Sequence, residues 1–394
     1  MAAVEHAPPR PDPFAIPPTD LVLLIRHRPV LMLDPQCDFT VLAAEAATDN
    51  PGSVLMRRRG ETIAAAGGTP PLHLHTLAQY PDERDARPTD HLAFPPDLTG
   101  ESRQLEREDA TRGRLYGRVV RGGERIWLQY WWFLLDNPKH LLGFGRHQGD
   151  WEMVQIGLSA GTQLPEVLTY AQHNHGEARA WEDAEHFEHD PDRPLVYVAT
   201  LSHASYFTAA THPYFPGVDD TRDDGPRLVD LPVVPFGPWV EWCGRWGATH
   251  HRWKLRGTSP PSPARQGVKW KDPAAWHARS ALRKPHRLFG RLVHALGDRT
   301  YPCAPHVTAD PPDEEGRVRV HWRKAAKRGG KHLMLSLDDG EHVLASRVVV
   351  DPPATGSALL RVPEGCTATT ARASVFNTLR QRSEAVEAEV PPPA

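Results

Sequence analysis

The sequence is poor in cysteine and has no long hydrophobic run. Its 394 residues include four cysteines, which lie far apart and form no CxxC pair. This spacing excludes a zinc finger, a thioredoxin motif and a dense disulfide framework. The longest apolar runs, Leu21–Ile25 and Trp131–Leu135, are much shorter than the roughly 20 residues that a membrane-spanning helix needs. We therefore expect no transmembrane segment.

Several common catalytic and nucleotide-binding motifs are also absent. The sequence contains no GxSxG, no GxxxxGKS/T, no HExxH and no GxGxxG after an expected strand. These absences argue against a serine-hydrolase elbow, a nucleotide phosphate loop and the common zinc-protease helix. Residues 1–18 lack the apolar core of a signal peptide, so we expect a cytoplasmic protein. The formal charge of −3 argues against nucleic acid as a partner.

Proline and tryptophan are the abundant features. The chain has 40 prolines, about twice the ordinary usage, so it cannot be mostly helical. Eleven of its 12 tryptophans lie between Trp127 and Trp276, which predicts the main core there. Short apolar segments separated by Pro and Gly, such as Ile126–Leu135 and Asp150–Leu158, predict strands. The pattern favours a mainly β chain whose main domain is an antiparallel β-sandwich.

Composition shifts along the chain predict two folded domains. We expect a β-like section over Leu21–Tyr80 and a late helix over 274–296, both in the first domain. Short alternating runs in the second domain predict a small immunoglobulin- or fibronectin-like sandwich. The expected divisions are a proline-rich tail (1–18), the main β-sandwich domain (19–300), a linker (301–313), the small β-sandwich (314–388) and a second tail (389–394).

The chemically informative segment is Gly145–Glu152. On a strand, Asp150 and Glu152 point to the same face, because side chains alternate. His147 lies three residues before Asp150, and Asp136 ends the preceding aromatic strand. Carboxylates and imidazoles are the ligands that divalent metals use. These residues predict a metal site, with Mg²⁺, Ca²⁺ or Mn²⁺ favoured by oxygen ligands and Zn²⁺ or Fe²⁺ by added histidines.

Three further histidines follow this segment. His173 and His175 are two residues apart, so on one strand they would share a face. His203 follows the expected strand Leu195–Leu201. Each is a candidate general base beside a metal. Taken singly, each of these residues is more often structural than functional, and it is their convergence at strand ends that predicts a site.

These motifs resemble the vacuolar protein sorting-associated protein 62 family. The resemblance rests on three ordered runs, namely His147-x-Gly-Asp-Trp-Glu152, Gln172-His173-x-x-Gly176 and Ser202-His203-Ala-Ser-Tyr206. It covers about residues 21–276. That family is in turn similar to the necrosis- and ethylene-inducing peptide-like proteins, whose hallmark reads Gly-His-Arg-His-Asp-Trp-Glu.

The resemblance implies an actinoporin-like β-sandwich that holds a divalent cation. Carried over residue by residue, the implied ligands are Asp136, His147, Asp150 and Glu152. In the necrosis-inducing relatives such a site helps to engage sugar headgroups of plant sphingolipids, and membrane damage follows. This sequence departs from the hallmark, because Gln148-Gly149 replaces the second histidine. A secreted plant toxin is therefore a poor fit.

Three functions fit this pattern. In the favoured one, a metal-dependent β-sandwich binds a small molecule, a glycan or a lipid headgroup, with tryptophans offering flat contact surface. In the second, the cation activates water or polarises a substrate, and His173, His175 or His203 is the general base. In the third, the cation is a structural staple between Asp136 and the strand of Asp150. The sequence predicts no oligomeric state.

Overall fold

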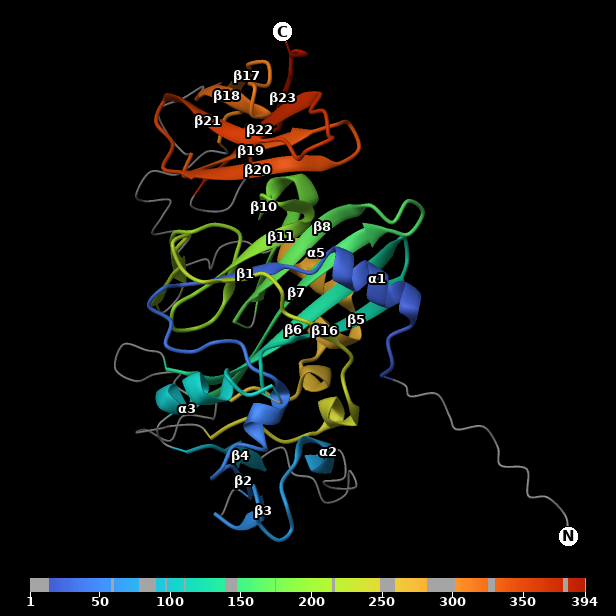
Figure 1. Ribbon diagram of the computed structural model, residues 1–394, viewed down its shortest axis with the longest axis vertical. Helices are drawn as coiled ribbons and strands as arrows, with labels where there is room; N and C mark the ends of the chain where they lie inside the picture. The colour runs from blue at the N-terminus through green and yellow to red at the C-terminus, as the bar shows by residue number, and fades with distance from the viewer. Residues whose placement is uncertain are drawn as a thin grey trace, which may run out of the picture.

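The computed structural model describes twelve segments of the chain. They are residues 14–57, 60–77, 90–95, 98–109, 111–138, 147–173, 175–214, 217–248, 259–281, 302–324, 330–377 and 382–393. The described chain is mainly β, as the sequence predicted, with several separate sheets (Figure 1).

A six-stranded sheet forms the centre of the molecule (Figure 1). Its strands, in spatial order, are β16 (Val233–Val234), β5 (Leu115–Gly122), β6 (Arg125–Asn137), β7 (His147–Ser159), β8 (Pro165–Gln172) and β9 (His175–Ala180). The two 13-residue strands β6 and β7 are buried over almost their whole length. Burial on both faces explains why β6 is a continuous aromatic run rather than an alternating one.

A second sheet packs beside the first. Its strands are β10 (His186–Phe187), β11 (Asp190–Val198), β1 (Val30–Leu33) and β15 (Arg227–Leu228), and β12 (Ser205–Tyr206) also pairs with β11. Here β1 runs parallel to β11, and in the central sheet β16 runs parallel to β5. These two pairs depart from the expected antiparallel pattern, because long connections let distant segments join as parallel neighbours.

Smaller elements surround these sheets. The remaining strands of this part are β2 (Val54–Met56), β3 (Thr62–Ala65), β4 (His91–Ala93), β13 (Thr211–Tyr214) and β14 (Gly217–Asp220). The helices are α1 (Pro18–Arg26), α2 (Leu74–Leu77), α3 (Leu98–Leu105), α4 (Val268–Lys271) and α5 (Pro273–Ala281), with 3-10 turns η1 (Ala44–Ala47), η3 (Trp181–Asp183), η4 (Pro238–Glu241) and η5 (Pro263–Arg265). No helix in the described segments is long and apolar enough to cross a bilayer.

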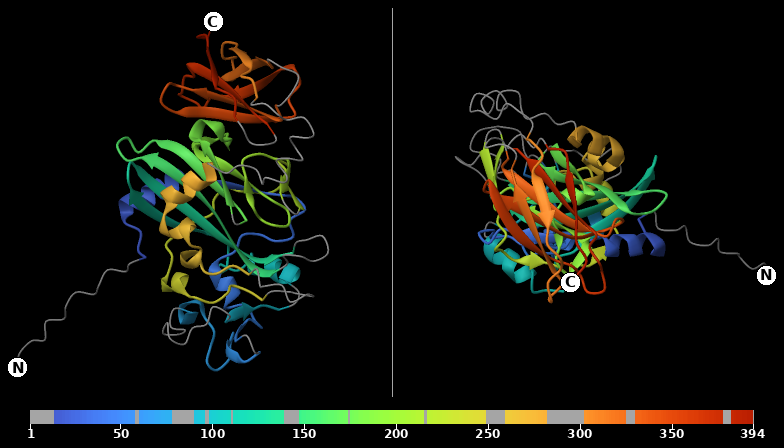
Figure 2. Two further views of the ribbon diagram at one scale, coloured as in Figure 1. Left: turned by 180° about the vertical axis from the view of Figure 1, so that it is seen from behind. Right: turned by 90° about the horizontal axis from the view of Figure 1, so that it is seen from above.

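The two helices that flank the sequence motifs differ from expectation. The apolar run Leu21–Ile25 lies in helix α1, whereas the sequence indicated β structure from Leu21 onward. Proline at the helix start and a salt bridge between Asp20 and Arg121 of β5 hold this helix in place. Helix α5 begins at Pro273 and packs against β9 and β8 (Figure 2). Positions 282–296 of the expected late helix lie outside the described residues.

Indole rings gather beside the start of β7. Trp151 stacks on Trp239 with ring centroids 5.7 Å apart and meets Trp246 edge-on at 5.1 Å. Phe133 of β6 packs on Trp151 at 5.2 Å. The Trp246 indole donates a hydrogen bond to the Ser262 hydroxyl at 2.7 Å. The prediction that the tryptophan-rich stretch forms the main core is confirmed.

The C-terminal part has two sheets that share a separate core. One contains β17 (His306–Ala309), β18 (Arg317–Arg323) and β21 (Thr355–Arg361), and the other contains β20 (Val343–Val350), β19 (His332–Asp338), β22 (Thr370–Phe376) and β23 (Val386–Glu389). Strand β17 lies inside the expected linker 301–313 and pairs with β18. The immunoglobulin- or fibronectin-like class of this part, like the actinoporin-like class of the main part, stays a prediction.

Candidate functional site

The start of β7 is fixed by two close backbone approaches. Gly149 has a φ of 66°, and a Cβ at this position would lie 1.7 Å from the Trp246 carbonyl oxygen. A Cβ on Gly247 would in turn lie 1.9 Å from the Gln148 carbonyl oxygen. Only glycine permits both approaches. They set the position of Asp150, the next residue along β7.

Gln148 has a structural role at this place. Its side-chain amide accepts a hydrogen bond from the Phe94 N–H at 2.9 Å and donates one to the Phe94 carbonyl at 3.1 Å. These two bonds join the segment after β4 to β7. The residue that stands in place of the hallmark's second histidine therefore ties two parts of the fold together.

Asp150 forms a buried pair with His203. Its Oδ2 accepts hydrogen bonds from His203 Nδ1 at 3.1 Å and from Asn137 Nδ2 at 3.3 Å. Burial alone would lower the pKa of the His203 imidazole, but the hydrogen bond to Asp150 and the neighbouring Cys37 thiol raise that pKa to about 10. His203 is fully buried, so this pair is an imidazolium held beside a carboxylate away from water.

Glu152 lies two residues after Asp150 on β7. Burial and the charge of Asp150 raise the pKa of the Glu152 carboxyl well above its usual range, and the charges of Lys269 and His203 oppose that rise. Burial likewise lowers the pKa of the Lys269 ammonium. Lys269 donates a hydrogen bond to the His173 carbonyl at 3.0 Å. Within the described residues, no hydrogen bond or ion pair reaches the Glu152 carboxylate.

Asp219 of β14 gathers a second set of donors. Its Oδ1 accepts a hydrogen bond from the Ser202 hydroxyl at 2.7 Å. Its Oδ2 accepts bonds from the Tyr206 hydroxyl at 2.7 Å and from His173 Nε2 at 2.9 Å. The charge of Asp219 also acts on Glu152. We call the three carboxylates Asp150, Glu152 and Asp219, with the cations His203 and Lys269, the acidic centre.

The structure brings together only part of the predicted site. Asp136 and His147 are buried at the adjoining ends of β6 and β7, and His147 Nδ1 bonds to the Gly149 carbonyl at 2.8 Å. In the described part of the chain, no three His, Cys, Asp or Glu side chains are grouped so as to hold a metal ion. Asp150 and Glu152 fit a hard cation by their donor chemistry. The ligand set Asp136, His147, Asp150 and Glu152 stays a prediction.

The expectation that His173 and His175 share a face of one strand is wrong. Strand β8 ends at Gln172 and β9 begins at His175, so the two histidines lie on either side of a tight turn. His173 adopts a φ of 55° there and reaches Asp219, whereas His175 is exposed at the start of β9. The apolar and polar alternation of this segment gave no indication of the turn.

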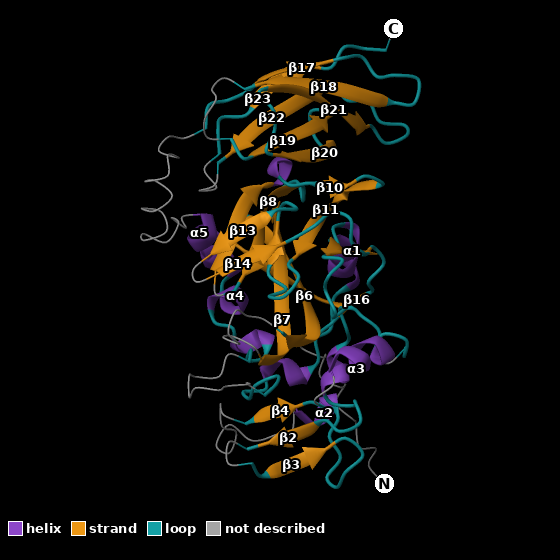
Figure 3. Cartoon of the chain, turned by 90° about the vertical axis from the view of Figure 1, so that its left-hand side faces the viewer, coloured by secondary structure: helices purple, strands orange, loops and turns teal. Residues whose placement is uncertain are grey.

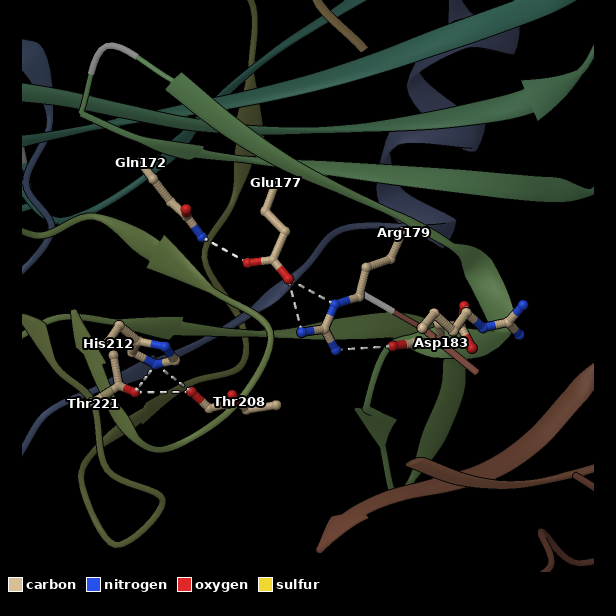
Figure 4. A network of polar contacts seen from close by, with 8 residues as sticks. Gln172, Glu177, Arg179, Asp183, Thr208, His212 and Thr221 are labelled. Atoms are coloured by element: carbon tan, nitrogen blue, oxygen red, sulfur yellow. Dashed lines mark hydrogen bonds and ion pairs between the residues drawn. The ribbon is translucent and has the colours of Figure 1, made fainter. Parts of the chain in front are cut away.

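A second buried network begins at the end of β8 (Figure 4). Gln172 donates to Glu177 at 3.0 Å, and the Arg179 guanidinium donates twice to Glu177, at 2.9 and 2.8 Å. The same guanidinium lies over the ring of Phe207 at 4.5 Å and over the ring of Phe376 at 4.4 Å. Phe376 belongs to β22, so the network links the acidic centre's neighbourhood to the C-terminal sheets.

Sequence reasoning missed Lys269 and Asp219. Lys269 lies in the short helix α4, more than a hundred residues after Glu152. Asp219 comes from the hairpin β13–β14, within a charged stretch that reads as solvated surface. No local spacing connects such residues, since only the folded topology places them together.

Comparison with solved structures finds toxin-like proteins at low similarity. One is described as a "toxin fold for microbial attack and plant defense" (13% identity, TM-score 0.29, 56% of this chain and 75% of that chain). Others are NLPPya in complex with mannosamine (14%, 0.28, 55% and 74%) and Necrosis and Ethylene inducing Protein 2 from the causal agent of cocoa's Witches Broom disease (12%, 0.28, 56% and 75%). Values this low transfer neither a fold nor a function to this chain.

The chain matches no protein-family model and no curated protein. The resemblance to the vacuolar protein sorting-associated protein 62 family therefore has no support beyond the motifs that suggested it. What the chain does has to be argued from the acidic centre itself.

Proposed function

We propose that this chain binds a hydroxyl-rich polar ligand, such as a glycan or a polyol headgroup, at the acidic centre. The observation that carries this proposal is Glu152, a residue only 6% exposed, whose carboxyl group receives no hydrogen bond from the described residues. A buried carboxylate without donors is costly. The hydroxyl groups of a bound ligand would supply those donors.

The charges around Glu152 favour a ligand that also carries positive charge. Asp150 and Asp219 add two further carboxylates, and His203 and Lys269 are the cations that act on Glu152. The centre thus has more carboxylates than cations. An amino sugar offers both hydroxyl donors and an ammonium group. Mannosamine and glucosamine, the sugars in the NLPPya complexes, are therefore suitable probes on chemical grounds.

We also propose a divalent cation at this place, with Mg²⁺, Ca²⁺ or Mn²⁺ favoured over Zn²⁺ or Fe²⁺. Asp136, His147, Asp150 and Glu152 would hold it, and the surplus of buried carboxylates supports it. When bound, such an ion neutralises carboxylates and offers coordination positions to ligand oxygens. In its absence the ammonium of an amino sugar is the expected counter-charge.

Calorimetric titration of mannosamine and glucosamine, with and without EDTA, tests the proposal. We expect Glu152→Gln to weaken binding at least tenfold, because the amide cannot become a carboxylate beside a bound ammonium group and presents N–H donors where the carboxylate presents only acceptors. Glu166→Gln is the matched control, since Glu166 lies exposed on β8 in an ion pair with Arg125. Equal binding by the Glu152→Gln variant and wild type contradicts the proposal. Plasma mass spectrometry of wild type and Asp150→Ala checks the cation separately.

The alternative of an enzyme with a histidine base has weaker support. His203 is the histidine that bonds to Asp150, but its pKa of about 10 keeps it protonated at neutral pH, so it is a poor base there. His175 is exposed outside the centre. Among the three histidines, His173 alone is half-buried in contact with Asp219. It is therefore the remaining base for a catalytic role.

A further inference from the structure

A second candidate site lies where the C-terminal sheets meet the main part. A cavity of about 610 Å³ opens between β20 and β21 on one side and β1, β10 and β11 on the other. Figures 1 and 3 show β20 next to β10 and β11. Its volume falls within the range of roughly 300–1,000 Å³ that is usual for small-molecule sites. We call it the interface cavity.

Direct contacts join the main part to the C-terminal part at and near the interface cavity. Asp183 accepts a hydrogen bond from the Ser374 hydroxyl at 3.1 Å and forms an ion pair with Arg382, whose Nε lies 2.5 Å from Asp183 Oδ2. On the cavity wall, the His186 N–H donates to the Ser346 hydroxyl at 2.6 Å. The His186 imidazole lies 3.0 Å from the same hydroxyl, and because burial lowers the pKa of this imidazole to about 3, it stays neutral across the neutral range. These contacts fix the two walls relative to each other.

The C-terminal wall is basic. Arg347 of β20 and Arg361 of β21 line the cavity and are exposed. Within the described residues, neither guanidinium forms a hydrogen bond or an ion pair. A guanidinium presents a planar fork of donors that matches a carboxylate or a phosphate. Two guanidinium groups on one wall therefore favour a ligand that carries an anionic group.

The opposite wall is acidic. Glu185 accepts a hydrogen bond from the Tyr197 hydroxyl at 2.6 Å, which leaves its second oxygen available. Asp223 lines the cavity and forms no ion pair within the described residues. The third acid, Glu188, is already paired with Arg227. The charges that remain for a ligand are thus carboxylates on this wall and guanidinium groups on the other.

Apolar side chains complete the lining between the two walls. They include Met32 and Leu195 from the main part and Val348, Leu359 and Leu360 from the C-terminal part. An apolar lining with a few charged groups is typical of sites for small organic ligands. It gives no reason to expect a bare inorganic ion.

We propose that the interface cavity binds a small zwitterionic organic molecule. Its acid group lies against Arg347 and Arg361, and its ammonium lies against Glu185 and Asp223. The fixed gap supports this, because the two charged walls do not meet in a direct ion pair across the described residues. This site is independent of the acidic centre, and its test uses different residues.

The test is calorimetric titration of the full chain with the free L-amino acids and with phosphocholine, which share an acid group and a cationic nitrogen. We expect at least one probe to bind, and the double variant Arg347→Gln, Arg361→Gln to bind it at least tenfold more weakly. Arg319→Gln is the matched control, because Arg319 is an exposed arginine on β18 that does not line the cavity. It should bind as wild type does.

Probes whose amino group is acetylated distinguish a site for a zwitterion from a site for a simple anion. An N-acetylated amino acid lacks the ammonium, so we expect it to bind more weakly than the free one and Asp223→Asn to reduce that difference. Three outcomes would each overturn the proposal. They are equal binding of the free and the N-acetylated amino acid, unchanged binding by the Arg347→Gln, Arg361→Gln variant, and no binding by any probe. Preference for amino acids over phosphocholine identifies the acid group as a carboxylate.

Discussion

At the scale of single residues, burial decides how each acid behaves. Asp150 is paired with a buried imidazolium, whereas Glu152 receives no hydrogen bond from the described residues. Both positions were predicted from the alternation of β7. The alternation does not predict the charges that act on these two acids, because His203 and Lys269 come from distant segments of the chain. The protonation behaviour of Asp150 and Glu152 is therefore set by the fold and not by their local sequence.

Glu185 gives a pH-dependent contribution to stability. Burial raises the pKa of its carboxyl from 4.5 to about 7, against the lowering effects of Tyr197 and Arg347, while Asp223 and Glu188 add to the rise. The folded state holds this proton more tightly than the unfolded state. The free energy of unfolding should therefore fall as pH rises from 4.5 to about 7, by at most roughly 3 kcal/mol.

Urea unfolding of Glu185→Gln between pH 4 and pH 8 checks this contribution. The variant should lose that part of the pH dependence and exceed wild type in stability above pH 7. Glu166→Gln, at the exposed ion pair with Arg125, should keep the wild-type slope. A slope that is the same in wild type and Glu185→Gln contradicts the assignment.

At the scale of elements, the hydrophobic pattern predicted the long strands correctly but did not predict a short helix and a short turn. Strands β6 and β7 follow from a continuous aromatic run and from DWEMVQIGL. Helix α1 was missed because five apolar residues in a row fit a strand or a buried helix equally well. The turn between β8 and β9 was missed because His173 takes a positive φ that only its tertiary contacts explain.

The start of β7 depends on glycine at position 149. In Gly149→Ala the new Cβ would meet the Trp246 carbonyl at 1.7 Å, so we expect a loss of more than about 3 kcal/mol in the free energy of unfolding. Gly123→Ala is the matched control, with a φ of 64° and open space around it. It should cost only about 1 kcal/mol. Equal losses measured by urea unfolding contradict the role of the close approach.

At the scale of the whole molecule, the two parts are joined by buried polar contacts. Arg179 lies between rings from both parts, and Asp183 bonds to Ser374 and Arg382. The sequence predicted strands in both parts, but it gave no sign of these contacts, since each residue reads as ordinary surface charge. The division into domains stays a prediction.

Asp183→Asn tests how far these contacts couple the two parts. We expect faster cleavage within 302–393 in limited proteolysis, because the amide removes the charge that pairs with Arg382. Glu182→Gln is the matched control, since Glu182 is the adjacent acid, 4.0 Å from the same arginine. Cleavage at the wild-type rate in Asp183→Asn would show that the contact does not couple the parts.

The indole cluster at the start of β7 also has an optical consequence. Trp151, Trp239 and Trp246 hold their rings within 6 Å of one another at fixed angles, next to Gly149 and the acidic centre. Indoles so close and so oriented couple their electronic transitions, which gives a strong near-ultraviolet circular dichroism band. The protein thus carries a built-in spectroscopic reporter of the packing at the start of β7, which can be followed without any label.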